Sequence, residues 1–214
     1  MEQITRPATP AYLEKKWGGS ELHLRKGKQW KANYKLNRNA GAFQWGNVTL
    51  VGTNYRLYDL LIDDLCNMTI NHCFYCDRKQ VIKGGVRPTI DHFFPKTKAP
   101  ILAYTWSNLF LSCDTCQGYK LDKFYRNLLL KFDRAEYNFD NYFMLDFANG
   151  KVLTRPDISW DDRRKARLTL TILGVNKDGR DVMRLEELGA FLISDPLQRV
   201  LNRFSFRYFI QRII

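Results

Sequence analysis

The stretch of sequence that decides the fold runs from residue 73 to residue 124 and reads CFYCDRKQVIKGGVRPTIDHFFPKTKAPILAYTWSNLFLSCDTCQGYKLDKF. It contains two Cys-x-x-Cys pairs, Cys73 with Cys76 and Cys113 with Cys116. Two such pairs are typical of a tetrahedral zinc site, because the spacing lets both sulfurs of one tight turn hold the same ion. The distance between the pairs costs only loop-closure entropy, which grows slowly with length. We expect a structural zinc ion, with disulfides or unligated thiols as the alternatives.

An Asp-His dipeptide lies between the two Cys pairs. Asp91 and His92 belong to RPTIDHFFPK, residues 87–96, which we expect to form a strand because Thr, Ile and Phe favour extended structure. Residues 113–123 are expected to form a helix that begins at the second Cys pair. The sequence therefore predicts two strands and a helix held around zinc.

A carboxylate next to an imidazole can support hydrolysis of a phosphodiester. Asp91 offers a hard oxygen ligand to Mg²⁺ or a similar ion, which would stabilise charge on the scissile phosphate. His92 can take a proton from water, because an imidazole with a pKa of about 6.5 suits a base near neutral pH. In a regular strand the two side chains point to opposite faces, so a bend would have to re-aim them. A surface ion pair is the alternative for an isolated dipeptide.

The same stretch resembles the HNH, or His-Me finger, endonuclease motif in its zinc-ribbon form. IDHFFPK matches the family's DH or EH pair, which implies that Asp91 is a catalytic metal ligand and His92 the general base. Asn108, in WSNLFLSC, matches the middle Asn of the motif, which holds a loop through hydrogen bonds to the backbone. Gln117 stands where the family usually has Asn or His as a second metal ligand, and Lys120 matches the Lys of its CNxxK ending.

Gln117 departs from the family's pattern. Its amide oxygen could still ligate, but one extra methylene moves that oxygen by about a bond length, and Mg²⁺ demands near-octahedral geometry at roughly 2.1 Å. Sequence alone leaves the role of Gln117 open. The resemblance implies Zn²⁺ as a structural cofactor and Mg²⁺ or Mn²⁺ as a catalytic one. The alternative is a zinc-stabilised nucleic-acid-binding or assembly module whose nuclease centre is weakened or inactive.

More of the chain is similar to the small HNH proteins of Septu-type and retron-associated bacterial antiphage systems. The similarity covers ITRPATPAYLEKKW at residues 4–17 and RLTLTILGVN at residues 167–176, in addition to the central motif. It implies an effector of antiphage defence that works with an ABC-type ATPase partner, in a larger retron or Septu complex. The helices after residue 155 and the apolar segment that follows them are then the expected partner interface.

The charge of the chain favours a polyanionic partner. There are 34 Lys and Arg against 22 Asp and Glu, a formal net charge of +12. Neutralising phosphates releases counterions, so we expect nucleic acid, DNA or RNA, as the substrate, with a solvated basic surface as the alternative. The basic segment at residues 18–46 interleaves aromatic residues that could stack bases, although a solvated loop has the same composition. The candidate contacts near the motif are Lys96, Lys98, Lys120 and Lys123.

Cysteine usage and hydropathy indicate the compartment. Four of the five cysteines lie in the two pairs, which favours a reducing environment. No apolar run approaches the roughly 18 residues of a membrane span, and the N-terminal residues do not resemble a signal peptide. We expect a cytoplasmic protein with no membrane partner.

The predicted fold class is α+β and mainly helical, with a central ββα-metal (His-Me finger) module, a four-cysteine zinc site and flanking helices. Residues 1–54 form an extended, basic segment with a short helix, and residues 55–130 form the zinc-framed module with its lead-in helix. Residues 131–214 form a hairpin and C-terminal helices that bind the partner. We expect one structural unit. The remaining predicted elements are helices at 11–17, 54–67, 127–132, 159–174, 178–193 and 197–214, and a hairpin at 143–153.

Overall fold

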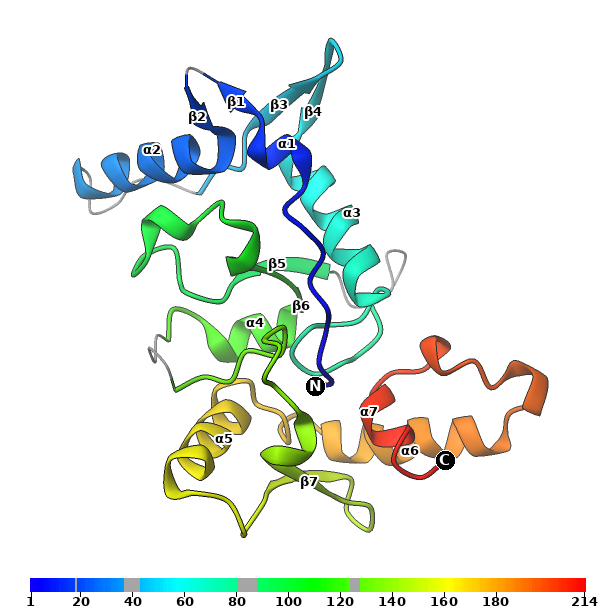
Figure 1. Cartoon of the computed structure of the whole chain (residues 1–214). Coiled ribbons are helices and arrows are strands. Elements are labelled where there is room, and N and C mark those ends of the chain that lie inside the picture. Colours follow the sequence, from blue (N-terminus) through cyan, green and yellow to red (C-terminus); the bar gives the residue numbers. More distant parts are fainter. Residues whose placement is uncertain (18, 37–42, 81–87, 124–127) are drawn as a thin grey trace.

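The computed structural model describes residues 1–17, 19–36, 43–80, 88–123 and 128–214 (Figure 1). Within these ranges the fold is α+β, as predicted, with seven α-helices and four two-stranded antiparallel sheets. The helices are α1 Ala11–Glu14, α2 Leu22–Leu36, α3 Leu57–Thr69, α4 Asp114–Lys120, α5 Trp160–Ile172, α6 Arg180–Ile193 and α7 Arg207–Ile210. The strands are β1 Lys16–Trp17, β2 Ser20–Glu21, β3 Asn47–Leu50, β4 Thr53–Arg56, β5 Pro88–His92, β6 Leu109–Cys113, β7 Phe143–Asp146 and β8 Lys151–Thr154.

Strand β6 lies between two hydrophobic cores. Every residue of LFLSC is buried, because successive side chains of a strand point to opposite faces and both faces are covered. Leu109 and Leu111 belong to the core formed with the N-terminal half of the chain, whereas Phe110 belongs to the core formed with the C-terminal half. In Figure 1 the β5–β6 pair and α4 accordingly lie in the middle of the molecule, between α1–α3 and α5–α7.

The N-terminal half is more regular than its composition predicted. The basic segment at residues 18–46 contains α2, a 15-residue helix that buries Leu22 and Trp30. The β3–β4 hairpin was also not predicted, and it turns at Val51 and Gly52, whose φ angles of 47° and 81° suit the positive φ that a tight hairpin needs at both positions. The lead-in helix predicted at 54–67 is observed as α3, shifted by a few residues.

The predicted hairpin at residues 143–153 is present as β7 and β8, but its turn differs from the expected type I′. Asp146 pairs with Lys151, so four residues connect the strands. Gly150 has a φ of 67°, and Asn149 is not among the described residues with positive φ. The Asp146 carboxylate instead organises the loop, since its Oδ1 accepts hydrogen bonds from the backbone N–H groups of Ala148 and Asn149 at 3.1 and 3.2 Å.

The boundaries of α5 and α6 follow their local signals. Ser159 Oγ accepts a hydrogen bond from the Asp162 N–H at 3.1 Å, as an N-cap residue does, and Gly174 past the end of α5 has a φ of 56°. The predicted helix at 178–193 is observed as α6. The prediction of α5 succeeded because it rests on capping residues that act within one turn, whereas Gly179, the N-cap of α6, makes no side-chain capping bond.

Two predicted helices are wrong, and a third, predicted at 11–17, ends at Glu14 since Lys16–Trp17 form β1. Residues 128–132 form turns, in which Leu130 N–H donates to Thr169 Oγ1 at 3.0 Å; residue 127 lies outside the described ranges. Residues 197–214 contain two short 3₁₀ turns and α7, because Phe206 adopts a left-handed φ of 54° and interrupts the helix. Phe206 N–H donates to Asp77 O at 2.8 Å, and the Arg207 guanidinium pairs with the Asp77 carboxylate at 2.6 Å. The C-terminal segment thus packs against the first Cys pair.

Candidate functional site

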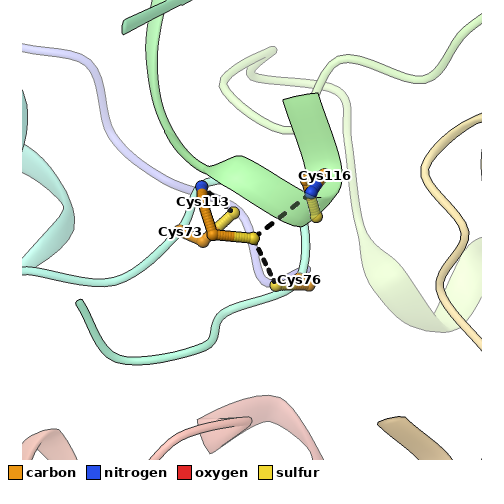
Figure 2. A group of neighbouring side chains, drawn as sticks. All are labelled: Cys73, Cys76, Cys113 and Cys116. Carbon is orange, nitrogen blue, oxygen red and sulfur yellow. Dashed lines mark hydrogen bonds between the residues drawn. The ribbon is translucent and has the colours of Figure 1, made fainter. Parts of the chain in front are cut away.

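The four paired cysteines converge in the centre of the molecule (Figure 2). Cys73 and Cys76 lie in the loop after α3, Cys113 ends β6 and Cys116 lies in the first turn of α4. All four are buried, and their sulfur atoms lie within 4.8 Å of one another. Zn–S bonds of about 2.3 Å in a tetrahedron separate the sulfurs by about 3.8 Å, and the Cys76 and Cys113 Sγ atoms are 3.9 Å apart. The cluster could therefore hold a metal such as zinc, as predicted.

The surroundings of the sulfurs suit thiolates. Cys73 Sγ accepts a hydrogen bond from Cys113 N–H at 3.3 Å, and Cys113 Sγ accepts one from Cys116 N–H at 3.4 Å. Arg180 Nη1, on a buried side chain of α6, lies 3.4 Å from Cys116 Sγ. These donors compensate part of the negative charge of a metal-bound cluster. Burial raises the pKa of Cys73, so a bound cation is needed to keep its thiolate.

Asp91 and His92 lie on β5, opposite Phe110 and Leu109 of β6. As expected for neighbours on a strand, their side chains meet different surroundings. Asp91 contacts Tyr75 and Lys120, on the side of the Cys cluster, whereas His92 contacts the 103–104 turn and aromatic residues that precede β3. The bend that the sequence analysis required to bring both side chains together is not evident in these contacts.

Asp91 is 5% exposed and already has two strong partners. Its Oδ2 accepts a hydrogen bond from the Tyr75 hydroxyl at 2.5 Å and lies 2.9 Å from Lys120 Nζ. Lys120 is fully buried and also donates to the His92 carbonyl at 2.6 Å. Burial raises the pKa of Asp91, although the Lys120 charge and the Tyr75 hydrogen bond oppose that shift. Sequence reasoning missed Tyr75, whose position between Cys73 and Cys76 was the available signal.

His92 is fixed in one tautomer. Its Nε2 lies 2.8 Å from the Ala103 carbonyl, which can only accept, so Nε2 carries the proton and Nδ1 keeps its lone pair. The ring stacks on Trp45 with a centroid distance of 5.5 Å and an interplanar angle of 7°, and Phe43 contacts it edge-on at 5.2 Å. Burial lowers the pKa of His92 to about 4, below the value of about 6.5 on which the sequence-based prediction relied, so the imidazole is neutral near pH 7 but a weaker base than expected. Trp45 and Phe43 were not predicted.

Asn108 makes the backbone hydrogen bonds that were expected of it. Its Oδ1 accepts from Phe94 N–H at 2.7 Å, and its Nδ2 donates to the carbonyls of Phe94 and Leu102, each at 3.1 Å. The side chain is buried. Asn108 therefore joins the segment after His92 to the turn that holds Ala103.

The other predicted residues have different surroundings. Gln117 is half-buried, and its Nε2 donates to Ile90 O at 3.4 Å, next to Asp91 in the chain. Lys96 Nζ lies 5.4 Å from the centroid of the Phe43 ring, and Lys98 and Lys123 are exposed. Lys120 has no exposed surface, so its assignment as a nucleic-acid contact is corrected: it is the buried ion-pair partner of Asp91.

Comparison with known proteins adds no family. A scan against protein-family models finds no match, and no curated protein matches the chain. Among the described helices, none is long and apolar enough to cross a membrane. Function is therefore inferred from the side chains of this site and their contacts.

Proposed function

We propose that the chain is a metal-dependent HNH endonuclease that hydrolyses phosphodiester bonds in nucleic acid. The observation that carries the proposal is the state of His92. Its Nε2–H bond to Ala103 O leaves Nδ1 as a proton acceptor, and the ring is neutral near pH 7. A general base needs both properties, an available lone pair and a fixed orientation. The carboxylate of Asp91 precedes it on the same strand.

The residues around His92 have separate roles in this proposal. Asp91 is the metal ligand, and Tyr75 and Lys120 orient its carboxylate through Oδ2. Gln117, which contacts Ile90 on the same strand, offers an amide oxygen as a second ligand. Mg²⁺ suits such a set, because it binds few protein oxygens and completes its shell with water and phosphate. When bound, Mg²⁺ or Mn²⁺ stabilises charge on the scissile phosphate.

The proposal extends to substrate and partner. A formal net charge of +12 supports a nucleic-acid substrate, and the phosphodiester chemistry is common to DNA and RNA. The resemblance to Septu-type and retron-associated proteins supports a role in antiphage defence with an ABC-type ATPase. In that role, the proposed ATPase interface lies beyond residue 155, on α6 and the C-terminal segment that follows it.

The test of the base is His92→Ala. Purified protein would be incubated in Mg²⁺ or Mn²⁺ with plasmid DNA, single-stranded DNA and total tRNA, with and without a co-purified ABC-type ATPase. We expect His92→Ala to keep its zinc content and fold but lose cleavage. His23→Ala is the matched control, because His23 lies outside the site. Its Nδ1 instead contacts the Leu13 carbonyl oxygen at 3.1 Å. Full cleavage by His92→Ala would refute the assignment.

One observation favours a second candidate, a zinc-stabilised nucleic-acid-binding or assembly module. Asp91 is only 5% exposed, and its charge is already balanced by the fully buried Lys120. Crystals soaked in excess Mn²⁺ distinguish the candidates through anomalous scattering. A manganese peak beside Asp91, separate from the zinc peak, supports the nuclease, whereas its absence supports the binding module.

A further inference from the structure

Helix α5 carries an outward row of basic and aromatic side chains that the proposed catalytic site does not use. The members of the row are three or four residues apart, so they share one face of the helix. They line a surface hollow of about 470 Å³, formed by Trp160, Arg163, Arg164, Arg167, Leu168 and Thr171. The opposite face packs into the protein through Ala166, Thr169 and Ile172. Of the outward row, Trp160, Arg164 and Arg167 are exposed.

Trp160 is the most unusual member of the row. It is 71% exposed, although burial of an indole normally contributes strongly to stability. The guanidinium carbon of Arg164 lies 5.6 Å from the centroid of the Trp160 ring. The row thus presents a broad aromatic surface beside a planar cation.

The positive charge of the row is not neutralised by neighbouring carboxylates. The Asp162 carboxylate binds Ser159 Oγ at 2.8 Å and Lys165 Nζ at 3.1 Å, on another side of the helix. Arg163 donates to the Pro156 carbonyl. In the described part of the chain, neither Arg164 nor Arg167 lies within ion-pair distance of a carboxylate.

We infer that this face of α5 binds single-stranded nucleic acid. Arg164 and Arg167 contact successive phosphates, and an unstacked base stacks on Trp160. Proteins that bind single strands combine a basic track with aromatic platforms, because every base has a π-face. A formal net charge of +12 adds a long-range attraction to the same ligand. The inference extends the proposed function by assigning a docking surface, and it is tested by binding rather than by cleavage.

The position of α5 connects the docking face with the candidate catalytic site. Lys165, on the same helix, lines a second hollow of about 290 Å³ together with Phe93 and Phe94, which directly follow His92. Thr169 of α5 binds the backbone of Leu130, another residue of that hollow. This second hollow lies on a different side of α5 from the docking row, so a strand held on the row would have to pass around the helix to reach the segment that carries the proposed base.

The experiment measures fluorescence anisotropy of a labelled dT20 oligonucleotide and a labelled 20-base-pair duplex over a salt series. All proteins carry His92→Ala and are measured without added Mg²⁺ or Mn²⁺, so that cleavage does not disturb binding. Trp160→Ala is expected to weaken binding of dT20 about 5- to 150-fold, because base–aromatic stacking contributes about 1–3 kcal/mol. It should leave the salt dependence unchanged and remove the preference for dT20 over the duplex.

Arg164→Gln combined with Arg167→Gln tests the phosphate contacts. Each contact to a single strand contributes about 0.7 to the slope of log K against log salt. The double variant should therefore reduce the slope by about 1.4 and weaken binding of both probes.

Matched controls come from β4, in the part of Figure 1 far from α5. The Arg56 side chain is 73% exposed, and Tyr55 is 41% exposed. Arg56→Gln and Tyr55→Ala should bind dT20 like the parent, and circular dichroism and zinc content check the fold of every variant. The inference is overturned if the α5 variants bind both probes like these controls. It is also overturned if the α5 variants bind both probes normally but no longer bind an ATPase partner, since α5 would then be a protein interface. Retained cleavage by His92→Ala refutes the base without changing the binding result.

Discussion

The buried ion pair between Asp91 and Lys120 gives a prediction that does not depend on catalysis. Lys120 has no exposed surface, Asp91 is 5% exposed, and their charged atoms are 2.9 Å apart. In Asp91→Asn, the Lys120 ammonium keeps only the His92 carbonyl of these partners. In Lys120→Met, the Asp91 carboxylate keeps only the Tyr75 hydroxyl. Removing one partner of such a pair costs about 3–5 kcal/mol of the free energy of unfolding, because the other charge stays buried.

The double variant should recover much of that loss. With both charges removed, no buried ion is left without a partner, so the destabilisation of Asp91→Asn/Lys120→Met is expected to be smaller than the sum of the two single changes. The coupling free energy from the double-mutant cycle should be about 2 kcal/mol or more.

The pH dependence of Lys120→Met has a definite sign. Burial already raises the pKa of Asp91 above its usual 3.8, and loss of the Lys120 charge raises it further. The folded state then holds the proton more tightly than the unfolded state, so stability falls as the pH rises from about 4 through the folded pKa. Lys120→Met should be less destabilised at pH 5 than at pH 8. The double variant, which lacks the carboxylate, should not show this difference.

Urea unfolding of zinc-loaded protein at pH 5 and pH 8 measures these quantities. Glu136→Gln is the control, because it removes one partner of an exposed ion pair. The Glu136 side chain is 72% exposed and that of its partner Arg134 is 60% exposed. That change should alter stability by less than about 1 kcal/mol. A coupling below about 1 kcal/mol, or a Lys120→Met variant that is equally destabilised at both pH values, would refute a buried charge pair.

Four further outcomes follow from the geometry. Cys113→Ser should remove bound zinc, measured by atomic emission, and lower the thermal midpoint, because the cluster joins both Cys pairs. Asn108→Ala removes three buried hydrogen bonds and should cost about 2–4 kcal/mol in urea unfolding. Burial raises the pKa of Cys66 to about 11 from its usual 9.0, so its alkylation by iodoacetamide at pH 8 should be about 100-fold slower than in unfolded protein, and should accelerate as the pH rises. Gly150→Ala should destabilise the β7–β8 hairpin, because the added Cβ would lie 2.0 Å from Asp181 O and φ is 67°; a variant with an unchanged melting temperature would contradict this packing.

Local chemistry explains which predictions succeeded. Residue types and short spacings predicted the convergence of the Cys pairs and the strand that carries Asp91. The backbone bonds of Asn108 were expected from the family resemblance alone. The partners of the candidate site lie elsewhere in the chain. Tyr75 and Lys120 reach Asp91 from either side of it in sequence, and Trp45 covers His92 from a segment that appeared to be a loop. Such contacts depend on tertiary packing, which spacing does not encode.

The two largest errors in secondary structure have specific causes. The basic composition of residues 18–46 gave no sign of the helix at 22–36; within that helix a Cβ on Gly27 would lie 2.4 Å from Ile101 O, so this glycine allows α2 to approach the turn at Pro100–Leu102. The apolar residues of 197–214 suggested a buried helix. They instead reach the core from short turns. Phe206, which has a left-handed φ, is buried there together with Tyr208 and Phe209.

The contact between Asp77 and Arg207 also affects how the protein is made. The two residues are 130 positions apart, and the first Cys pair immediately precedes Asp77. At synthesis rates of about 5–20 residues per second, Arg207 follows Asp77 by about 7 to 26 s. Once Cys116 has been made, the nascent chain has both Cys pairs but still lacks the segment that packs against the first of them. The bonds of Asp77 with Phe206 and Arg207 can form only after translation has passed Arg207, so the loop that holds the first Cys pair gains these contacts last.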